Sequence, residues 1–279
     1  MNNEIAIQTI SAKQAETQVP ALDDMVGNDE IRRHFQGRLQ EPFVGDSNVL
    51  IEGKPGTGKT NAILSYLQQR FNDPTFEAGD VFEKRKEQWN IAQSDYDLRF
   101  WQTNSGDNKV YAYLRVDGGT DSKGDIEVKL RDARNNHADH TYMVLDEAGE
   151  LYFRGLEEMF RPILTDPRIT VYATAQNFHN KRKTDSSEEA ADRLSAFLRR
   201  FPNQFHTQNP TEKDLVHFLI RRMKLWEVKL DEAATLRLLV RKSGGVVGYA
   251  LIPIIKAINQ GRLLTRDLVE RTDIDPNGR

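Results

Sequence analysis

Two patterns of hydrophobic and polar positions alternate along the first three quarters of the chain. Short apolar runs predict buried strands at residues 48–52, 110–116, 141–145 and 169–174. Between these runs, apolar residues recur at three- and four-residue spacing, which predicts helices at residues 29–39, 60–71, 126–134 and 151–164. Strands that alternate with helices are typical of an α/β fold, in which helices cover both faces of a parallel sheet.

The pattern changes after about residue 205, where the predicted strands stop and helical spacing continues. Four short helices are expected there, at residues 213–226, 231–242, 248–259 and 265–271. A length of 279 residues suits two domains. We therefore expect a flexible N-terminal arm, an α/β domain, a small all-helical lid domain and a tail, at residues 1–22, 23–206, 207–272 and 273–279 respectively.

One stretch inside the α/β region, residues 72–108, fits neither pattern. It is rich in Asp, Glu, Lys and Gln, with Trp89 and Trp101 between the polar residues. Segments with such a charge pattern are most often solvated surface. We expect an irregular or partly helical excursion, which is either a solvated insertion or a surface on which a partner docks.

Composition narrows the class of protein. Hydrophobic residues make up 38% of the chain and charged residues 29%, which indicates a soluble globular protein with a sizeable core. The formal net charge of −3 confines any DNA contact to a local patch. The chain has no cysteine, which excludes disulfides, thiolate metal sites and a cysteine nucleophile. We expect a cytoplasmic protein without a membrane segment, because no apolar run reaches ~20 residues and the start lacks signal-peptide features.

The strongest chemical signal is a glycine-rich motif between a predicted strand and a predicted helix. Residues 53–60 read GKPGTGKT and fit G-x-x-x-x-G-K-[ST]. Glycines let backbone N–H groups face phosphates, and the start of the helix adds its positive end. Lys59 would bind the β- and γ-phosphates, and the Thr60 hydroxyl would bind Mg²⁺. The alternative is a glycine-rich turn with no ligand. The motif assigns phosphate binding to Gly53, Pro55, Gly56, Thr57, Gly58, Lys59 and Thr60.

A pair of carboxylates follows directly on the predicted strand at residues 141–145. The carboxyl ends of parallel strands form the rim where α/β sheets bind ligands. We expect Asp146 to hold Mg²⁺ and Glu147 to polarise the attacking water, because phosphoryl transfer needs both a metal anchor and a water positioner. The alternative is an acidic pair that is favourable at the N-terminus of a helix.

A polar amide follows the next predicted strand, at residues 169–174. Asn177 lies three residues beyond the end of that strand, on the rim that is expected to carry Asp146. Its amide would orient the lytic water or contact the γ-phosphate. Asn is also an ordinary turn residue, and the spacing alone does not separate these two interpretations.

Together these residues resemble the AAA+ ATPases, and within them the small subunits of clamp loaders of the replication factor C type. Residues 53–60 match the family's Walker A motif, and Leu-Asp-Glu-Ala at 145–148 matches Walker B. Residues 116–124 are similar to the clamp-loader segment between the two motifs, and Asn177 takes the sensor-1 place. The resemblance covers roughly residues 22–272 and implies ATP and Mg²⁺ as cofactors.

Two further assignments come from this resemblance. Residues 22–28 are similar to the family's segment that packs against adenine, which assigns Val26 and Gly27 to the base. The resemblance also implies an oligomer, of identical or different subunits, whose active sites are shared between neighbours. An arginine finger reaches the neighbouring ATP in that family, and Arg200 lies in its place, with Arg199 and Arg193 as alternatives.

The chain also departs from the clamp-loader pattern. Residues 198–201 read Leu-Arg-Arg-Phe where clamp loaders carry Ser-Arg-Cys. Gly248 or Tyr249 stands where the sensor-2 arginine is expected, which would remove one contact to the γ-phosphate. We also expect no C-terminal collar domain after the lid, which argues against a standard clamp-loader role.

The resulting functional hypothesis is an oligomeric ATPase that assembles on, or remodels, DNA or protein complexes in replication, recombination or transposition. Basic clusters that would touch DNA phosphates, or else form solvated helix faces, lie at residues 181–183, 221–224 and 237–242. The alternatives are a nucleotide-gated assembly platform and a remodeller of a protein partner, both without DNA. A remodeller would use an aromatic pore loop, for which Phe153 is the candidate; the alternative is that Tyr152 and Phe153 are core residues at the start of a helix.

Overall fold

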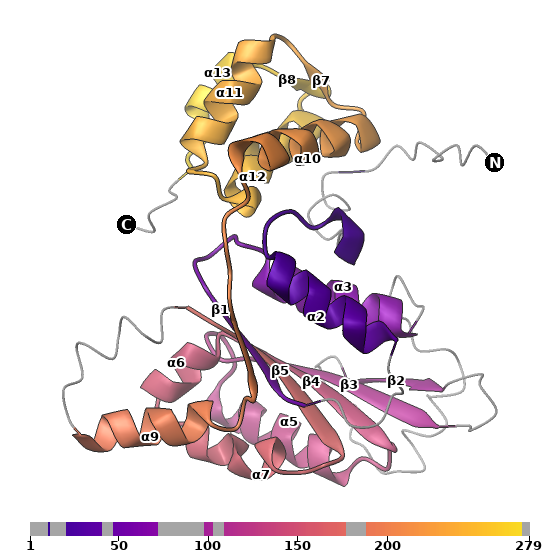
Figure 1. Ribbon diagram of the computed structural model, residues 1–279, viewed down its shortest axis with the longest axis vertical. Coiled ribbons are helices and arrows are strands. Elements are labelled where there is room, and N and C mark those ends of the chain that lie inside the picture. Colours follow the sequence, from indigo (N-terminus) through magenta and orange to yellow (C-terminus); the bar gives the residue numbers. More distant parts are fainter. Residues whose placement is uncertain are drawn as a thin grey trace.

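The computed structural model describes residues 11, 21–40, 47–71, 98–102, 109–176 and 188–274. Within them, six strands form one sheet in the order β2-β3-β4-β5-β1-β6 (Figure 1). All neighbours pair in parallel except β2, which is antiparallel to β3. The strands are β1 (Val49–Glu52), β2 (Leu98–Gln102), β3 (Val110–Asp117), β4 (His140–Asp146), β5 (Ile169–Ala175) and β6 (Asn203–His206). The expected α/β fold with a parallel sheet is therefore confirmed.

Helices cover both faces of this sheet (Figure 1). On one face lie α2 (Asp29–Leu39) and α3 (Lys59–Phe71). The other face carries α5 (Lys123–Asn135), α6 (Ala148–Phe153), α7 (Arg161–Leu164) and α9 (Glu188–Leu198). Short 3₁₀ turns are η1 (Leu22–Asp24) and η2 (Glu157–Phe160). Each face has its own hydrophobic core, as expected for a sheet that is buried on both sides.

The two cores follow from the alternation of side chains along the strands. In β4, Tyr142 and Val144 pack with α2 and α3, whereas Met143 and Leu145 pack with the helices of the opposite face. All seven residues of β4 are buried, and so are all seven of β5. Strands that are buried on both faces read as continuous apolar runs, and this is why their positions could be predicted.

Two strands and one α-helix of the α/β part were not predicted, and the single helix expected at residues 151–164 is instead divided into α6, η2 and α7. Strand β2 lies within residues 72–108, so the expectation of an irregular or partly helical excursion is wrong for Leu98–Gln102; the remainder of that stretch lies outside the described residues. Strand β6 and helix α9 were also missed. Both strands are at edges of the sheet, and β6 buries only Phe205 well, so its apolar signal is weak.

Four helices follow the sheet, as expected, and surround a separate core. They are α10 (Glu212–Leu225), α11 (Ala233–Lys242), α12 (Val247–Asn259) and α13 (Arg266–Arg271), called here the helical unit. Two short strands, β7 (Lys229–Leu230) and β8 (Leu263–Leu264), pair in parallel within it and were not predicted. The helical unit stacks over the α2–α3 side of the sheet (Figure 1). None of the described helices combines the length and apolar character needed to cross a membrane.

Candidate nucleotide-binding site

The glycine-rich motif forms the turn between β1 and α3, so a parallel strand leads into it and a helix starts at its end. Lys59 is the first residue of α3, and its ammonium donates to the carbonyls of Gly53 at 2.8 Å and Lys54 at 2.9 Å. Burial lowers the pKa of Lys59, although Asp146 and Glu147 oppose that shift. The loop therefore wraps around a single buried cation at the N-terminus of a helix, an arrangement that suits an anion such as a phosphate.

Asp146, the last residue of β4, joins residues that are far apart in the sequence. Its Oδ1 accepts a hydrogen bond from the Thr60 hydroxyl at 2.9 Å and another from the Thr174 hydroxyl. Its Oδ2 accepts from the guanidinium of Arg115 at 2.5 Å. A hydroxyl and a carboxylate oxygen side by side form the hard oxygen donor set that Mg²⁺ prefers, so Thr60 and Asp146 fit the expected metal role.

Glu147 begins the turn into α6 with a left-handed backbone, at a φ of 52°. This conformation is uncommon for residues other than glycine, and it is held by the hydrogen bond that its N–H donates to the Thr174 hydroxyl at 3.1 Å. The Gln176 amide donates to its carboxylate at 3.1 Å. Burial, followed by the charges of Asp117 and Asp146, raises the pKa of Glu147, which makes its carboxylate a stronger base than an exposed one.

Among the described residues, Gln176 supplies the amide at this carboxylate. Asn177 lies outside the described residues, so its sensor role stays a prediction. Side chains alternate along a strand, and Thr174 and Gln176 share the face that meets Asp146 and Glu147. That alternation was the signal in the sequence that could have identified both residues.

The loop between β3 and α5 packs directly against Glu147. A Cβ atom added to Gly118 would lie 2.5 Å from the carbonyl oxygen of Glu147, and one added to Gly119 would collide with its carboxylate. The carbonyl of Gly118 accepts a hydrogen bond from Arg154 at 2.7 Å. Residues 116–124, singled out for their similarity to a clamp-loader segment, therefore lie beside the predicted catalytic carboxylate.

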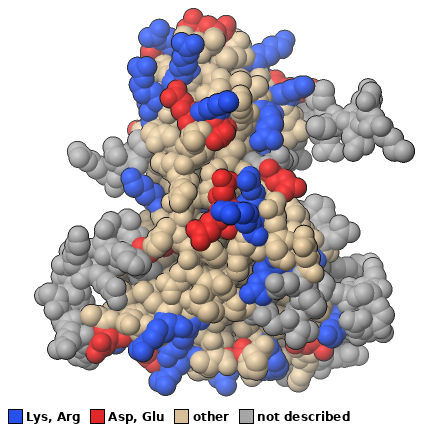
Figure 2. All heavy atoms as spheres, in the orientation of Figure 1, with Lys and Arg blue, Asp and Glu red and all other residues tan. Residues whose placement is uncertain are grey.

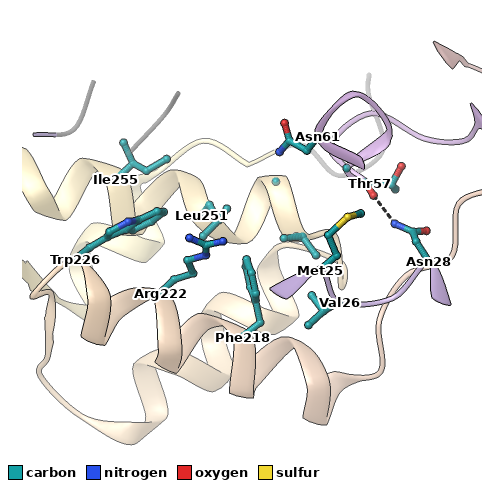
Figure 3. A pocket seen from close by; sticks show the side chains of 13 residues that line it. Met25, Val26, Asn28, Thr57, Asn61, Phe218, Arg222, Trp226, Leu251 and Ile255 are labelled. Atoms are coloured by element: carbon teal, nitrogen blue, oxygen red, sulfur yellow. Dashed lines mark hydrogen bonds between the residues drawn. The ribbon is translucent and has the colours of Figure 1, made fainter. Parts of the chain in front are cut away.

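A cavity of about 240 Å³ lies between the phosphate loop and the helical unit (Figure 3). Its walls come from the segment before α2, the start of α3, and helices α10 and α12; they include Val26, Thr57, Phe218, Trp226, Leu251 and Ile255. Arg222 lies over the rings of Phe218 and Trp226, at 5.3 and 5.8 Å from their centroids. Flat apolar walls with a few polar groups suit a nucleobase.

Only one of the two residues predicted to contact the base, Val26, lines this cavity. Val26 lines both this cavity and a neighbouring groove, whereas Gly27 lines the groove alone. Asn28 fixes the segment: its side-chain amide donates to the Thr57 carbonyl at 2.9 Å, and its oxygen accepts from the Gln208 N–H at 2.7 Å. The phosphate loop, this segment and the connection to the helical unit are thus tied together by one buried side chain.

The helical unit touches the phosphate loop through two glycines. The N–H of Gly248, in the first turn of α12, donates to the Gly56 carbonyl at 2.9 Å. A Cβ atom added to Gly248 would lie 2.9 Å from the Cα of Gly56, closer than real Cβ atoms approach. An arginine at this position would collide with the loop, which explains physically why the expected sensor-2 guanidinium is absent from position 248.

The three arginine-finger candidates lie at or after α9, away from the cavity-lining residues. Arg193 pairs with the buried carboxylate of Glu157, with 2.9 Å between Nε and Oε1, which indicates a structural role. Arg200 donates to the Ala196 carbonyl at 3.0 Å and Arg199 is exposed. The choice between Arg200 and Arg199 stays a prediction.

The structure changes the interpretation of several other residues that the sequence suggested as partner-binding. Arg222 is buried and faces the cavity, so the expectation that it touches DNA is wrong. Lys242 donates to three carbonyls at the end of α13, those of Val269, Glu270 and Thr272, and thereby acts as a structural cap. Phe153 is 41% exposed at the end of α6 and is not a core residue. Residues 181–183 lie outside the described part of the chain.

Comparison with known proteins gives matches at the level of structure. No protein-family model and no curated protein sequence matches the chain. A RuvB variant from Thermotoga maritima is 16% identical with a TM-score of 0.51, over 93% of this chain and 75% of RuvB. Orc1 from Aeropyrum pernix, solved with DNA, is 15% identical with a TM-score of 0.56, over 89% of this chain and 65% of Orc1. Hsp104, solved with ATPγS and FITC-casein, is 18% identical with a TM-score of 0.52, over 92% of this chain and 42% of Hsp104.

These structures share an architecture with the chain rather than a close sequence relationship. The chain spans three quarters of the RuvB structure, about two thirds of Orc1 and less than half of Hsp104. The likeness is one of fold: a parallel sheet with helices on both faces. On this likeness, the chain has the AAA+ P-loop NTPase fold that is found in RuvB, Orc1 and Hsp104.

Proposed function

We propose that this protein is an AAA+ ATPase that binds Mg²⁺ and ATP between the sheet and the helical unit and hydrolyses ATP to ADP and phosphate. The observation that carries the proposal is the meeting of Thr60, Asp146 and Glu147 beside the phosphate loop. The apolar cavity next to the loop would hold the adenine. We also propose that the α/β part and the helical unit are separate domains, at residues 23–206 and 207–272.

Each residue at the site then has a physical role. The loop N–H groups and Lys59 bind the phosphates, and Thr60 and Asp146 hold Mg²⁺, which neutralises phosphate charge when it is bound. Glu147 orients the attacking water and accepts its proton, and its raised pKa favours proton uptake. Gln176 holds the Glu147 carboxylate in place through its amide.

We propose that the active form is an oligomer that works on DNA or protein complexes. The resemblance to clamp-loader subunits supports DNA, and so do exposed cations on the helical unit at Arg221, Lys224, Arg237 and Arg241. Blue side chains gather over this unit with red ones among them (Figure 2), so the surface is mixed rather than uniformly basic. The alternative, a platform or remodeller that acts on a protein without DNA, is supported by the exposed Phe153.

The deciding experiment measures the ATPase rate and the particle mass of the pure protein, with and without single- and double-stranded DNA. DNA-stimulated turnover together with ATP-driven assembly supports the DNA-engaged role. If the protein hydrolyses ATP and DNA changes neither quantity, the partner is a protein. A protein that does not bind ATP at all is incompatible with the proposal.

The same assay tests the arginine finger. Arg200→Ala should spare ATP binding, because the finger acts on the neighbouring subunit, and it should lower turnover by about 100-fold or more. Arg199→Ala is the matched control on the adjacent residue. Unchanged turnover in the Arg200 variant, with a loss in the Arg199 variant, would move the assignment by one position.

A further inference from the structure

Arg115 lies at the predicted catalytic rim and has no role in the function proposed above. It is the third-last residue of β3, and its side chain is 43% exposed. Its guanidinium reaches across to β4 and binds Oδ2 of Asp146 at 2.5 Å. The Asp146 carboxylate raises the pKa of Arg115, although burial of the guanidinium opposes that shift. A permanent cation therefore sits on the carboxylate that is expected to hold Mg²⁺.

A divalent cation held by the same carboxylate would weaken this contact. Two hydroxyls, those of Thr60 and Thr174, already use Oδ1, and the guanidinium uses Oδ2. Two cations on one carboxylate repel each other strongly at such short range. Arg115 has a long and half-exposed side chain, so it can move without unpacking the core.

The order of strands indicates where the displaced guanidinium would go. The sheet runs β3-β4-β5-β1, so Arg115 lies on the far side of β4 from the phosphate loop that follows β1. The cavity proposed for the base lies between that loop and helices α10 and α12. Thr60, at the end of the loop, contacts Asp146, which in turn contacts Arg115, so a nucleotide with its base in the cavity and its phosphates along the loop would end near Asp146 and Arg115.

We propose that Arg115 binds the γ-phosphate of ATP within its own subunit, after release from Asp146. This inference rests on the proposed ATPase function. Arg115 would supply a guanidinium for the terminal phosphate. The helical unit supplies none at position 248, where Gly248 contacts the loop. An arginine fork binds phosphate oxygens strongly, and ADP lacks the phosphate concerned, so Arg115 discriminates ATP from ADP.

The test compares the affinity for a non-hydrolysable ATP analogue with that for ADP, both with Mg²⁺, by titration calorimetry. Arg115→Met should lower the affinity for the analogue by about tenfold or more, as expected for loss of one charge-assisted contact. It should change the affinity for ADP by less than about twofold. Arg115→Lys should recover part of the difference, because it keeps the charge but not the fork. Arg168→Met is the control: Arg168 pairs with Asp166 at the opposite ends of the strands and should change neither affinity.

Equal weakening of both nucleotides, or no change in either, would overturn the assignment. A wild-type protein that binds neither nucleotide would instead overturn the proposed function. A second measurement follows Mn²⁺ binding without nucleotide by electron paramagnetic resonance. Arg115→Met should tighten Mn²⁺ binding, because Asp146 loses its competing cation; unchanged or weaker binding contradicts the exchange. Thermal unfolding of each variant confirms that it folds.

Discussion

The two ends of the candidate site are built in different ways. The end that we propose to bind phosphates consists of the glycine-rich loop and charged side chains on the rim of one sheet, with Lys59, Thr60 and Asp146 at its centre. The base end consists of mostly apolar side chains from the segment before α2 and from the helical unit. The phosphate end should therefore decide whether ATP binds and reacts, and the base end should set the affinity for all nucleotides alike.

The largest expected effect is at the phosphate end. Lys59→Ala should reduce ATP affinity by about 100-fold or more, because it removes the buried ammonium that would bind two phosphates. Titration calorimetry measures the change. Lys54→Ala is the control in the same loop, since Lys54 is exposed, and it should change affinity by less than about threefold. Parental affinity in the Lys59 variant would refute the site assignment.

At Glu147, a substitution should affect the turnover rate but not the binding of ATP. Glu147→Gln should lower turnover by about 100-fold or more while ATP still binds, because the amide cannot accept the proton of the water. The variant should accumulate as an ATP-bound oligomer, which light scattering with nucleotide detection would show. Glu158→Gln, on the exposed surface of η2, is the control and should retain most turnover. Full activity of the Glu147 variant would exclude it as the base.

The contact between the two ends can be disturbed by a single methyl group. Gly248→Ala should lower the affinities for ATP and ADP together, by about tenfold. The added Cβ would collide with backbone atoms of Gly56 and push α12 off the loop. Gly37→Ala is the control, since open space surrounds Gly37 in α2, and it should stabilise the fold by ~0.5–1 kcal/mol. Fluorescence titration and thermal unfolding measure the two effects. Undiminished affinity for both nucleotides would show that this contact does not support binding.

The smallest effect is expected deep in the base end. Arg222→Met should lower the affinities for ATP and ADP by the same factor, about three- to tenfold, because the base and its stacking partners are common to both nucleotides. Arg221→Met, on the exposed neighbour, is the control. The ratio of the two affinities is the quantity to measure. A changed ratio would mean that Arg222 contacts the phosphates, and the division between the two ends would fail.

The sequence predicted those strands and helices whose burial leaves a continuous or helical apolar pattern. Strands β4 and β5 are buried on both faces and were found within one or two residues of their ends. Strand β2 escaped because its buried residues, Leu98 and Phe100, stand at the end of a long charged stretch. Strand β6 escaped because pairing with β1, rather than its own composition, makes it a strand.

The candidate site divides in the same manner. The chemistry proposed for the phosphate loop and the carboxylate pair was predicted from the sequence alone, because backbone curvature, charge and metal affinity follow from contiguous residue types. The contacts of Arg115 with Asp146, of Gln176 with Glu147, and of Gly248 with Gly56 were decided by the tertiary structure. Each joins segments that no local pattern relates, and only the order of strands and the packing of the helical unit bring them within hydrogen-bonding distance.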